Sequence, residues 1–285
     1  MFGAAKGVRV EPGWWGERLV VTSEWSDSIA RHLRAKGIRE LVLNYALGFK
    51  GSDVGFLATI PELEGLTLLH WTIDDVSPIH SLRRLRGLDL KTYCKTAIDF
   101  SSFPGLEKCV FEWRPKSESL FGCRSLKDLF VNKYKGKDTS AFGALASLES
   151  LSICNSPVAS LEGLRGLAQL ERLELHNLSQ LASLRGLEGL GRLRRLVVDG
   201  CRKIGRIDEL AGLTGLEELH LNGVGPIASL KPLASLAGLG ALLFYDDTNV
   251  EDGDLSPLLG LGRLARVEFE NRKHYSHRTG DFARK

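Results

Sequence analysis

The chain has 285 residues, and its 38 Lys and Arg side chains nearly balance 35 Asp and Glu side chains. A net charge of +3 does not indicate bulk attraction to nucleic acid. The sequence has no run of 18 apolar residues, which excludes a predicted membrane-spanning helix.

Two further features concern the compartment. The N-terminal residues lack the apolar core of a signal peptide, so we expect none. The five cysteines are odd in number, scattered and without C-x-x-C spacing, which is typical of reduced thiols. Together these features predict a cytoplasmic protein.

Residues 1–37 are expected to form an N-terminal cap made of a hairpin and a helix. Apolar residues at 8–10 and 19–21 flank a turn at Pro12 and Gly13. Ser26 suits the N-cap of a helix, and Gly37 suits the position after its end.

Trp14, Trp15 and Trp25 lie in the same region. We expect these rings to cover the open end of the repeated motifs that begin at Ile38. The alternative is that the three tryptophans bind a ligand.

Residues 38–270 consist of about eleven copies of one motif, Leu-x-x-Leu-x-Leu, in steps of 20 to 25 residues. The copies begin at Ile38, Leu63, Leu85, Leu106, Leu126, Leu148, Leu170, Leu193, Leu216, Leu239 and Leu264. Apolar positions 4 and 6 alternate with polar positions, as a half-buried strand requires.

After each strand the apolar spacing becomes three, as in Ile204, Ile207 and Leu210, which suits a 3₁₀ turn. One copy cannot bury its own leucines, so the copies must stack. We therefore predict an α/β solenoid with a parallel sheet on the concave face and short 3₁₀ or helical segments on the convex face. It would form one elongated domain, and we expect a monomer.

This motif resembles the short, 22-residue class of leucine-rich repeat, found in bacterial internalins and in a regulatory subunit of eukaryotic protein phosphatase. The resemblance covers about residues 38–270. It implies a curved horseshoe, a bacterial origin and binding of another protein on the concave sheet.

One departure from those families concerns repeat position 9, where they commonly carry Asn. No copy has Asn at that position here, but Asn155, Asn177 and Asn271 stand one place earlier. Either the turn after the strand differs, or the register shifts by one residue there.

The candidate partner-binding residues are those expected on or beside the concave face, mostly at repeat positions 5 and 7. A mixed apolar and charged surface of this kind is typical of a protein-binding site. They are Lys91, Val110, Glu112, Trp113, Phe130, Asn132, Lys133, Glu174, His176, His220 and Tyr245.

Five aromatic residues directly after the strands could form a stripe along one rim of that face. They are Tyr45, Trp71, Tyr93, Trp113 and Tyr134. The alternative favours inward packing for the three at position 9, namely Trp71, Tyr93 and Tyr134. For Tyr45 and Trp113, at position 8, exposure and burial are equally open.

The charges are unevenly distributed along the repeats. Residues 83–138 hold thirteen Lys and Arg against seven Asp and Glu, whereas residues 246–270 hold seven acidic residues against two arginines. This asymmetry could orient a partner and speed its arrival. The alternative is that these charges lie on solvated loops and cancel.

Sequence motifs for catalysis are absent: there is no G-x-x-x-x-G-K-[ST], no H-E-x-x-H and no G-x-S-x-G. Cys154 and His176 could lie one strand apart on the same face. His274 and His277 lack a third metal ligand nearby in the sequence. We therefore expect no catalytic residues, no metal and no cofactor, and we expect residues 271–285 to form a C-terminal cap or tail.

The sequence favours a non-enzymatic protein that binds another protein on its concave face, in a sharper version an inhibitor or immunity-type protein. The alternative is a binder of nucleic acid or another anionic ligand through the basic and aromatic repeats 3–5. An enzyme built on the curved face is a third hypothesis, for which the sequence offers no catalytic constellation.

Overall fold

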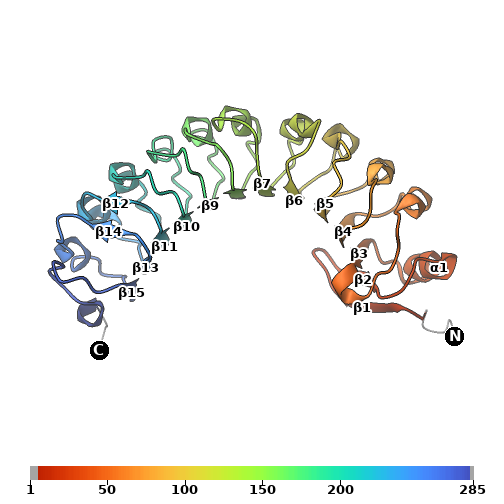
Figure 1. Ribbon diagram of the computed structural model, residues 1–285, viewed down its shortest axis with the longest axis horizontal. Helices are drawn as coiled ribbons and strands as arrows, with labels where there is room; N and C mark the ends of the chain where they lie inside the picture. The colour runs from red at the N-terminus through yellow and green to blue at the C-terminus, as the bar shows by residue number, and fades with distance from the viewer. Residues whose placement is uncertain (1–5, 283–285) are drawn as a thin grey trace. The chain divides into compact units, whose positions relative to one another are not determined.

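The computed structural model describes residues 6–282, which form two compact units divided between Lys127 and Asp128. Unit 1 contains the residues up to Lys127, and unit 2 begins at Asp128. In both units the strands lie on the inner side and the 3₁₀ helices on the outer side (Figure 1).

Unit 1 begins with an antiparallel hairpin followed by parallel strands in chain order. Its strands are β1 (Val8–Pro12), β2 (Glu17–Val21), β3 (Glu40–Asn44), β4 (Gly65–His70), β5 (Gly87–Thr92) and β6 (Lys108–Glu112). Its helices are α1 (Asp27–Lys36) and the 3₁₀ helices η1 (Tyr45–Leu47), η2 (Gly55–Thr59), η3 (Ser77–Ser81), η4 (Phe100–Ser102) and η5 (Ser117–Gly122).

Unit 2 has one long parallel sheet and a second, two-stranded one. The long sheet consists of β7 (Asp128–Asn132), β8 (Ser150–Cys154), β9 (Arg172–His176), β10 (Arg195–Asp199), β11 (Glu218–Asn222), β13 (Ala241–Phe244) and β15 (Arg266–Phe269). The short sheet pairs β12 (Pro226–Ile227) with β14 (Asn249–Val250). The 3₁₀ helices are η6 (Ser140–Ala144), η7 (Glu162–Leu164), η8 (Asp208–Gly212), η9 (Lys231–Ser235), η10 (Ser256–Leu258) and η11 (Thr279–Phe282).

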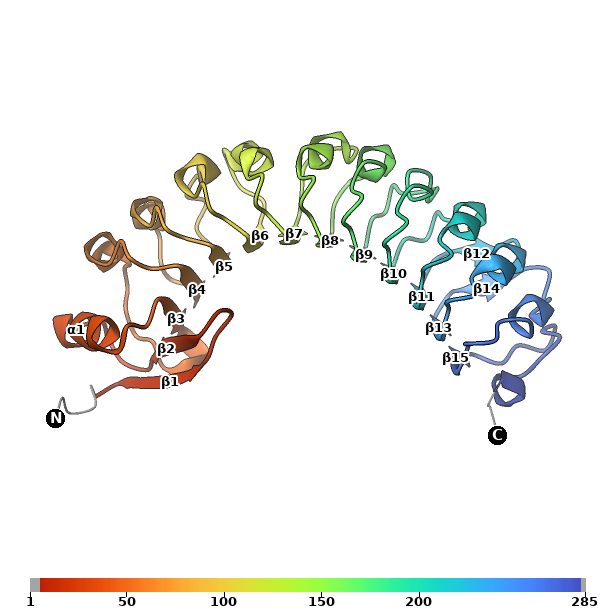
Figure 2. The same ribbon diagram turned by 180° about the vertical axis from the view of Figure 1, so that it is seen from behind.

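A strand begins two residues after each of the eleven predicted motif starts. Repeat positions 4 and 6 are buried in every copy, and the same position pairs across neighbouring strands, as in Leu173, Leu196 and Leu219. On the outer side, Ile204, Ile207 and Leu210 are also buried around η8. The prediction of an α/β repeat solenoid is therefore confirmed (Figure 2).

Repeat position 8 determines how the chain leaves the strands of unit 2. Six consecutive residues at this position adopt the left-handed conformation, with φ between 51° and 66°: Lys133, Asn155, Asn177, Gly200, Gly223 and Asp246. The amides of the first five donate to the backbone carbonyl at position 7 of the next strand, at 2.8–3.2 Å. Asn and Gly tolerate this conformation best, which explains why Asn stands at position 8.

The asparagine side chains also connect neighbouring repeats. Asn177 donates through Nδ2 to Asn155 Oδ1 at 3.1 Å, and Asn155 donates in the same way to Asn132 at 2.8 Å. Asn155 and Asn177 therefore belong to position 8 of their repeats, where the left-handed turn begins. Because the left-handed residue redirects the chain, position 9 packs inward at Tyr134, Ser156 and Leu178.

The strands of unit 1 leave the sheet differently. Position 8 has an ordinary negative φ, and β4 and β5 extend through it. Side chains alternate along a strand, so His70 and Thr92 at position 8 are buried, whereas Trp71 and Tyr93 at position 9 point outward. This difference between the two units determines which aromatic residues are exposed.

The N-terminal hairpin forms as predicted, but two tryptophans lie elsewhere than expected. The backbone amides of Trp14 and Trp15 donate to the carboxylate of Glu40, each at 2.8 Å, and Glu40 is only 5% exposed. A methyl group added to Gly87 would lie 2.5 Å from the Trp14 ring. The hairpin tip therefore covers the starts of β3, β4 and β5, and the open end of the first repeat is not its site.

The helix of the cap matches its predicted bounds. Ser26 occupies the N-cap, although its side chain makes no capping hydrogen bond and contacts Ser28 instead. Gly37 ends the helix with φ of 66°. The Trp25 ring stacks on Phe56 of η2 with ring centroids 4.0 Å apart. At the other end, Tyr275 packs edge-on against Phe269 of β15.

Candidate partner-binding surface

Three aromatic side chains form a continuous ladder at the edge where β3, β4 and β5 end. The Trp71 and Tyr93 rings stack with centroids 4.6 Å apart and 26° between their planes. The Tyr45 ring lies 5.7 Å from Trp71 at a tilt of 58°. Tyr45 is 45% exposed and Tyr93 is 70% exposed. We call these three residues the aromatic ladder.

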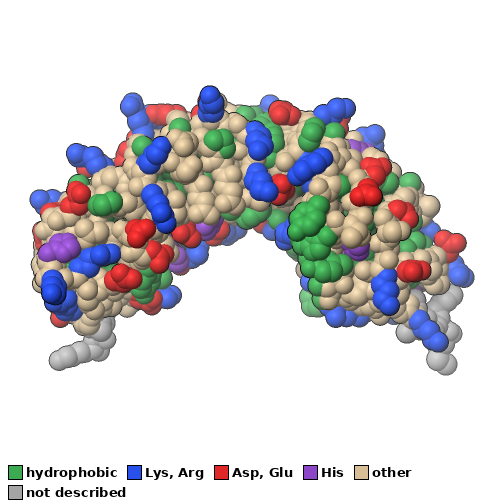
Figure 3. Space-filling view, viewed as in Figure 1, with side chains coloured by type: hydrophobic (Ala, Val, Ile, Leu, Met, Phe, Trp, Pro, Cys, Tyr) green, Lys and Arg blue, Asp and Glu red, His purple; other side chains and the backbone are tan. Residues whose placement is uncertain are grey.

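Hydrophobic side chains gather on one side of unit 1 near β4 and β5 (Figure 3). Leu69 at position 7 of β4 is half-buried and precedes the ladder on the same face. Exposed aromatic rings are expensive to leave in water and are enriched at the energetic centres of protein interfaces. The ladder is therefore the strongest candidate for an anchor.

The inward-packing alternative was wrong for Trp71 and Tyr93, since these side chains point outward, and right for Tyr134, which is 6% exposed. The reason is the difference at position 8 between the two units. Tyr45 is exposed because β3 ends at Asn44, whose side chain accepts a hydrogen bond from the Ala46 amide and begins η1.

Trp113 is a correction to the predicted site. This side chain is only 9% exposed, and its ring packs 6.1 Å from Phe111 and 6.0 Å from Phe121. It occupies position 8, as the buried residues His70 and Thr92 do. Trp113 therefore belongs to the core and cannot contact a partner directly.

The sheet face of unit 1 beside the ladder is a mixture of charged and apolar side chains. Lys91 is exposed and pairs with Asp89 at 3.2 Å, and Lys95 pairs with Glu112 at 3.4 Å. Val110 is half-buried. Burial raises the pKa of the Asp89 carboxyl, although the charge of Lys91 opposes it, and Asp89 Oδ1 is buried without a hydrogen-bond partner.

In unit 2 the candidate partner-binding residues differ in exposure. Phe130, Asn132, Glu174, His176, His220 and Tyr245 are half-buried, and Lys133 is exposed on its left-handed turn. Val197 and Leu243, two apolar residues at position 5 of their strands, are buried, with 5% and 8% of their surface exposed.

The charged residues of this face pair with one another across strands. Arg195 bridges Glu174 of β9 and Glu218 of β11. His220 contacts Glu218 at 2.7 Å, and the Tyr245 hydroxyl donates to Glu268 at 2.7 Å. Pairs of this kind stabilise a rigid polar surface but leave few charges free for a partner.

Cys154 and His176 occupy paired positions of β8 and β9, as the sequence suggested. They do not form a nucleophile and base. The His176 nitrogens lie 3.6 Å from Glu174 and 3.5 Å from Asp199. Burial, with a contribution from Glu174, raises the pKa of Cys154 to about 11, so this sulfur is a thiol at neutral pH.

Residues 6–282 contain no group of three His, Cys, Asp or Glu side chains arranged to hold a metal ion. Within the same range, no helix is both long and apolar enough to cross a bilayer.

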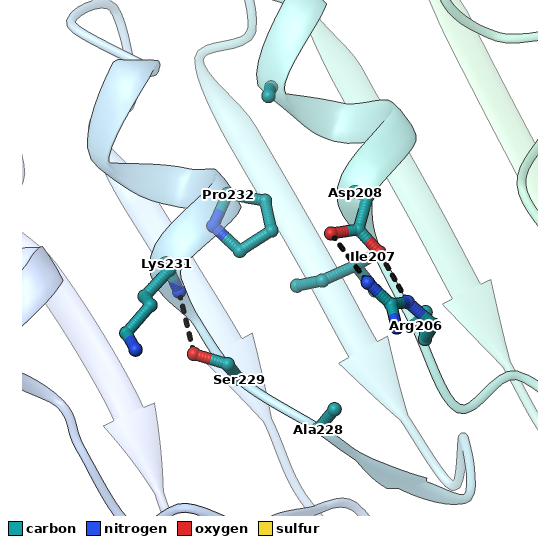
Figure 4. A pocket seen from close by; sticks show the side chains of 8 residues that line it. Arg206, Ile207, Asp208, Ala228, Ser229, Lys231 and Pro232 are labelled. Carbon is teal, nitrogen blue, oxygen red and sulfur yellow. Dashed lines mark hydrogen bonds and ion pairs between the residues drawn. The ribbon is translucent and has the colours of Figure 1, made fainter.

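A groove on the outer side of unit 2, between η8 and η9, has a volume of about 440 Å³ (Figure 4). Its polar groups satisfy one another. Arg206 pairs with Asp208 at 2.7 Å, and the Lys231 amide donates to Ser229 at 3.1 Å. The groove therefore presents few groups to a ligand, and the sheet face and its ladder remain the better candidate.

Comparisons with known proteins agree with this repeat geometry. A family model for the leucine-rich repeat domain of the endo-β-N-acetylglucosaminidase EndoS matches residues 142–242. No curated protein matches the sequence.

Among solved structures, the internalin InlF of Listeria monocytogenes is 19% identical with a TM-score of 0.62, over 78% of this chain and 67% of that one. The functional domain of Listeria monocytogenes InlJ is 16% identical with a TM-score of 0.58, over 90% and 55%. A TDR receptor is 15% identical with a TM-score of 0.62, over 86% and 45%. This chain thus spans about half the length of the latter two.

The chain therefore has the leucine-rich repeat fold, and a leucine-rich repeat family model matches part of unit 2. At this level of identity the solved structures establish the fold. Proteins with this fold are in general protein-interaction modules.

Proposed function

We propose that this protein binds another protein through unit 1, with the aromatic ladder of Tyr45, Trp71 and Tyr93 as the main anchor. The observation that carries the proposal is the stack of Trp71 on Tyr93, which leaves Tyr93 70% exposed beside a mixed polar sheet face. Stacking holds both rings in place before binding, so little side-chain entropy remains to be lost when a partner docks.

The alternative, an anionic ligand such as nucleic acid, is less well supported. A nucleic-acid site needs several basic side chains free to neutralise phosphates. Here Lys91 and Lys95 pair with Asp89 and Glu112, and Arg86 lies between Glu64 and Glu107 at 3.6 and 2.7 Å. Balanced pairs favour a protein partner over a polyanion.

The test is affinity capture from the cell that produces the protein, read by mass spectrometry. Wild type is compared with Trp71→Ala/Tyr93→Ala and with Leu259→Ala, which removes a 57% exposed apolar side chain of unit 2. A partner held by wild type and by Leu259→Ala, but lost by the ladder variant, supports the proposal. Equal capture by all three proteins contradicts it.

The finer proposal is an inhibitor or immunity-type role, in which occupying the partner's surface is itself the effect. It requires that the captured partner be an enzyme or toxin whose activity falls in proportion to complex formation. A partner that keeps full activity in the saturated complex would refute the inhibitor role without affecting the binding proposal.

A further inference from the structure

Cys94 differs from the other cysteines of the chain. It lies two residues beyond the end of β5, directly after Tyr93 of the aromatic ladder, and it is partly exposed. Cys109, Cys123, Cys154 and Cys201 are all buried. Cys94 is therefore the thiol that a reagent in solution can reach.

A buried guanidinium points at this sulfur. Arg114 is only 5% exposed, and its Nη1 has the Cys94 sulfur as its contact, at 3.9 Å. Its other contacts are neutral and long: Nη2 to the Thr92 hydroxyl and Nε to the Glu112 carbonyl oxygen, both at 3.4 Å. All three guanidinium nitrogens thus have a contact, but none of these contacts is an anion.

The charge of Arg114 also lacks a carboxylate partner among the described residues. The nearby Glu112 carboxylate pairs with Lys95, and Asp75 accepts hydrogen bonds from the amide and the hydroxyl of Ser77. A buried charge without a counter-charge is costly. A thiolate at Cys94 is the anion that this geometry can accommodate.

Two hydroxyl groups beside the Cys94 sulfur also favour the thiolate. The Thr92 hydroxyl lies 3.2 Å from the sulfur, and that of Thr96 lies 3.7 Å away. Burial raises the pKa of the Cys94 thiol, but hydrogen bonds from Thr92 and Thr96 and the charge of Arg114 outweigh it, so the pKa lies below its usual value. The thiolate is the nucleophilic form of cysteine.

We propose that Cys94 is a site of reversible thiol–disulfide exchange with small-molecule disulfides, with Arg114 as the positioning residue. The Cys94 thiolate attacks one sulfur of the disulfide, a new S–S bond forms to Cys94, and the old S–S bond breaks. The second sulfur leaves with the electron pair as a thiolate, so no other oxidant is required. Attack by a free thiol on the mixed disulfide reverses the step.

The position of Cys94 gives this modification a consequence that rests on the proposed function. A group attached to Cys94 would stand next to Tyr93, whose ring is the most exposed of the ladder. It would therefore hinder the docking of a partner there. The chemistry of the thiol itself does not depend on that partner.

The experiment uses the folded full chain and oxidised glutathione as the probe. Peptide mass mapping after incubation at neutral pH is expected to find the adduct on Cys94, and none on the buried cysteines. Cys94→Ser is expected to take up no glutathione. An adduct that forms equally in Cys94→Ser, or on Cys154 as fast as on Cys94, would overturn the proposal.

The role of Arg114 is tested by the pH dependence of alkylation of Cys94 with iodoacetamide. In Arg114→Met the midpoint of the rate profile should move to higher pH, and alkylation at neutral pH should slow about tenfold for each unit of that shift. Circular dichroism establishes whether this variant folds. Thr92→Val, which removes the hydroxyl beside the sulfur at nearly constant volume, is the second variant. Profiles identical to wild type in the folded variants would contradict the assignment.

Discussion

Trp71 stacks on Tyr93 at a centroid distance of 4.6 Å because both side chains occupy repeat position 9 of adjacent, in-register strands. In unit 2 the same position is buried in the first five copies, from Tyr134 to Val224. The exposed stack therefore arises from a backbone difference one residue earlier, at His70 and Thr92, which keep the strand extended where unit 2 turns through a left-handed residue.

Leu173 at position 4 of β9 is fully buried between Leu151 and Leu196 of the neighbouring strands. Leu173→Ala should destabilise the protein by about 2–5 kcal/mol, through lost burial and the cavity left behind. A urea melt measures this loss. Leu259→Ala, at a side chain 57% exposed, is the control and should change stability by less than about 0.5 kcal/mol. A loss below about 1 kcal/mol for Leu173→Ala would argue against its core assignment.

The left-handed turn of unit 2 can be tested at Gly200. Its φ is +66°, and an added methyl group would lie 2.3 Å from Oδ1 of Asn177, the preceding member of the position-8 row. Gly200→Ala should therefore cost at least about 1–2 kcal/mol of unfolding free energy. Gly191→Ala, where no atom lies within 4 Å of the added methyl, is the matched control. Similar melts for the two variants would show that the turn does not constrain position 8.

The packing of the hairpin tip predicts a coupling between Gly87 and Trp14. A methyl group at Gly87 would lie 2.5 Å from the Trp14 ring and 2.8 Å from the Trp15 ring. Gly87→Ala should destabilise the wild-type chain by about 1–3 kcal/mol, the usual cost of overpacking. The cost should be smaller in a Trp14→Ala background, as a double-mutant cycle in urea would measure. If the two substitutions change the unfolding free energy additively, Trp14 does not pack against Gly87 and the account of the hairpin tip is contradicted.

Much of this architecture was predictable from the sequence, because the position of each of the eleven repeat strands follows from the spacing of buried leucines such as Leu173 and Leu196. The exposure of the aromatic residues was not. The leucine pattern is the same in both units, and the turn at position 8 decides the direction of the next side chain. The available signal was the residue type there: Asn155, Asn177 and Gly200 suit a left-handed turn, whereas His70 and Thr92 do not.

Other contacts lay beyond the sequence pattern altogether. The Glu40 carboxylate accepts hydrogen bonds from the amides of Trp14 and Trp15, which lie 26 and 25 residues away in the sequence, and nothing local to Glu40 marks it as buried. The same holds for Arg114 beside Cys94, since charged residues are rarely buried. Such contacts depend on how successive repeats stack and can be found only in three dimensions.

Ion pairs on the sheet face of unit 2 should make the free energy of unfolding depend on pH in the acidic range. The hydrogen bond from Arg195 lowers the pKa of the Glu218 carboxyl from its ordinary 4.5, despite an opposing effect of burial. A folded-state pKa below the unfolded value stabilises the fold above pH 4.5, and this contribution is lost as the pH falls through the folded pKa. Urea midpoints should therefore fall between about pH 5 and about pH 3.

Arg195→Met should reduce that dependence, because Glu218 then titrates closer to its ordinary pKa in the folded chain. Arg206→Met, at an exposed pair with Asp208 on the outer side of unit 2, is the comparison for a surface arginine. A midpoint that is constant over this pH range in wild type would contradict the pKa direction of Glu218.

The most direct test of the central claim is the affinity of the captured partner for variants of Tyr93, measured by isothermal titration calorimetry. If the exposed ring is an anchor, Tyr93→Ala should weaken binding by about 30-fold or more, corresponding to about 2 kcal/mol. Tyr93→Phe, which keeps the stack on Trp71, should bind within a few-fold of wild type. Unchanged affinity in Tyr93→Ala, with an unchanged urea melt, would contradict the assignment of the aromatic ladder as the binding site.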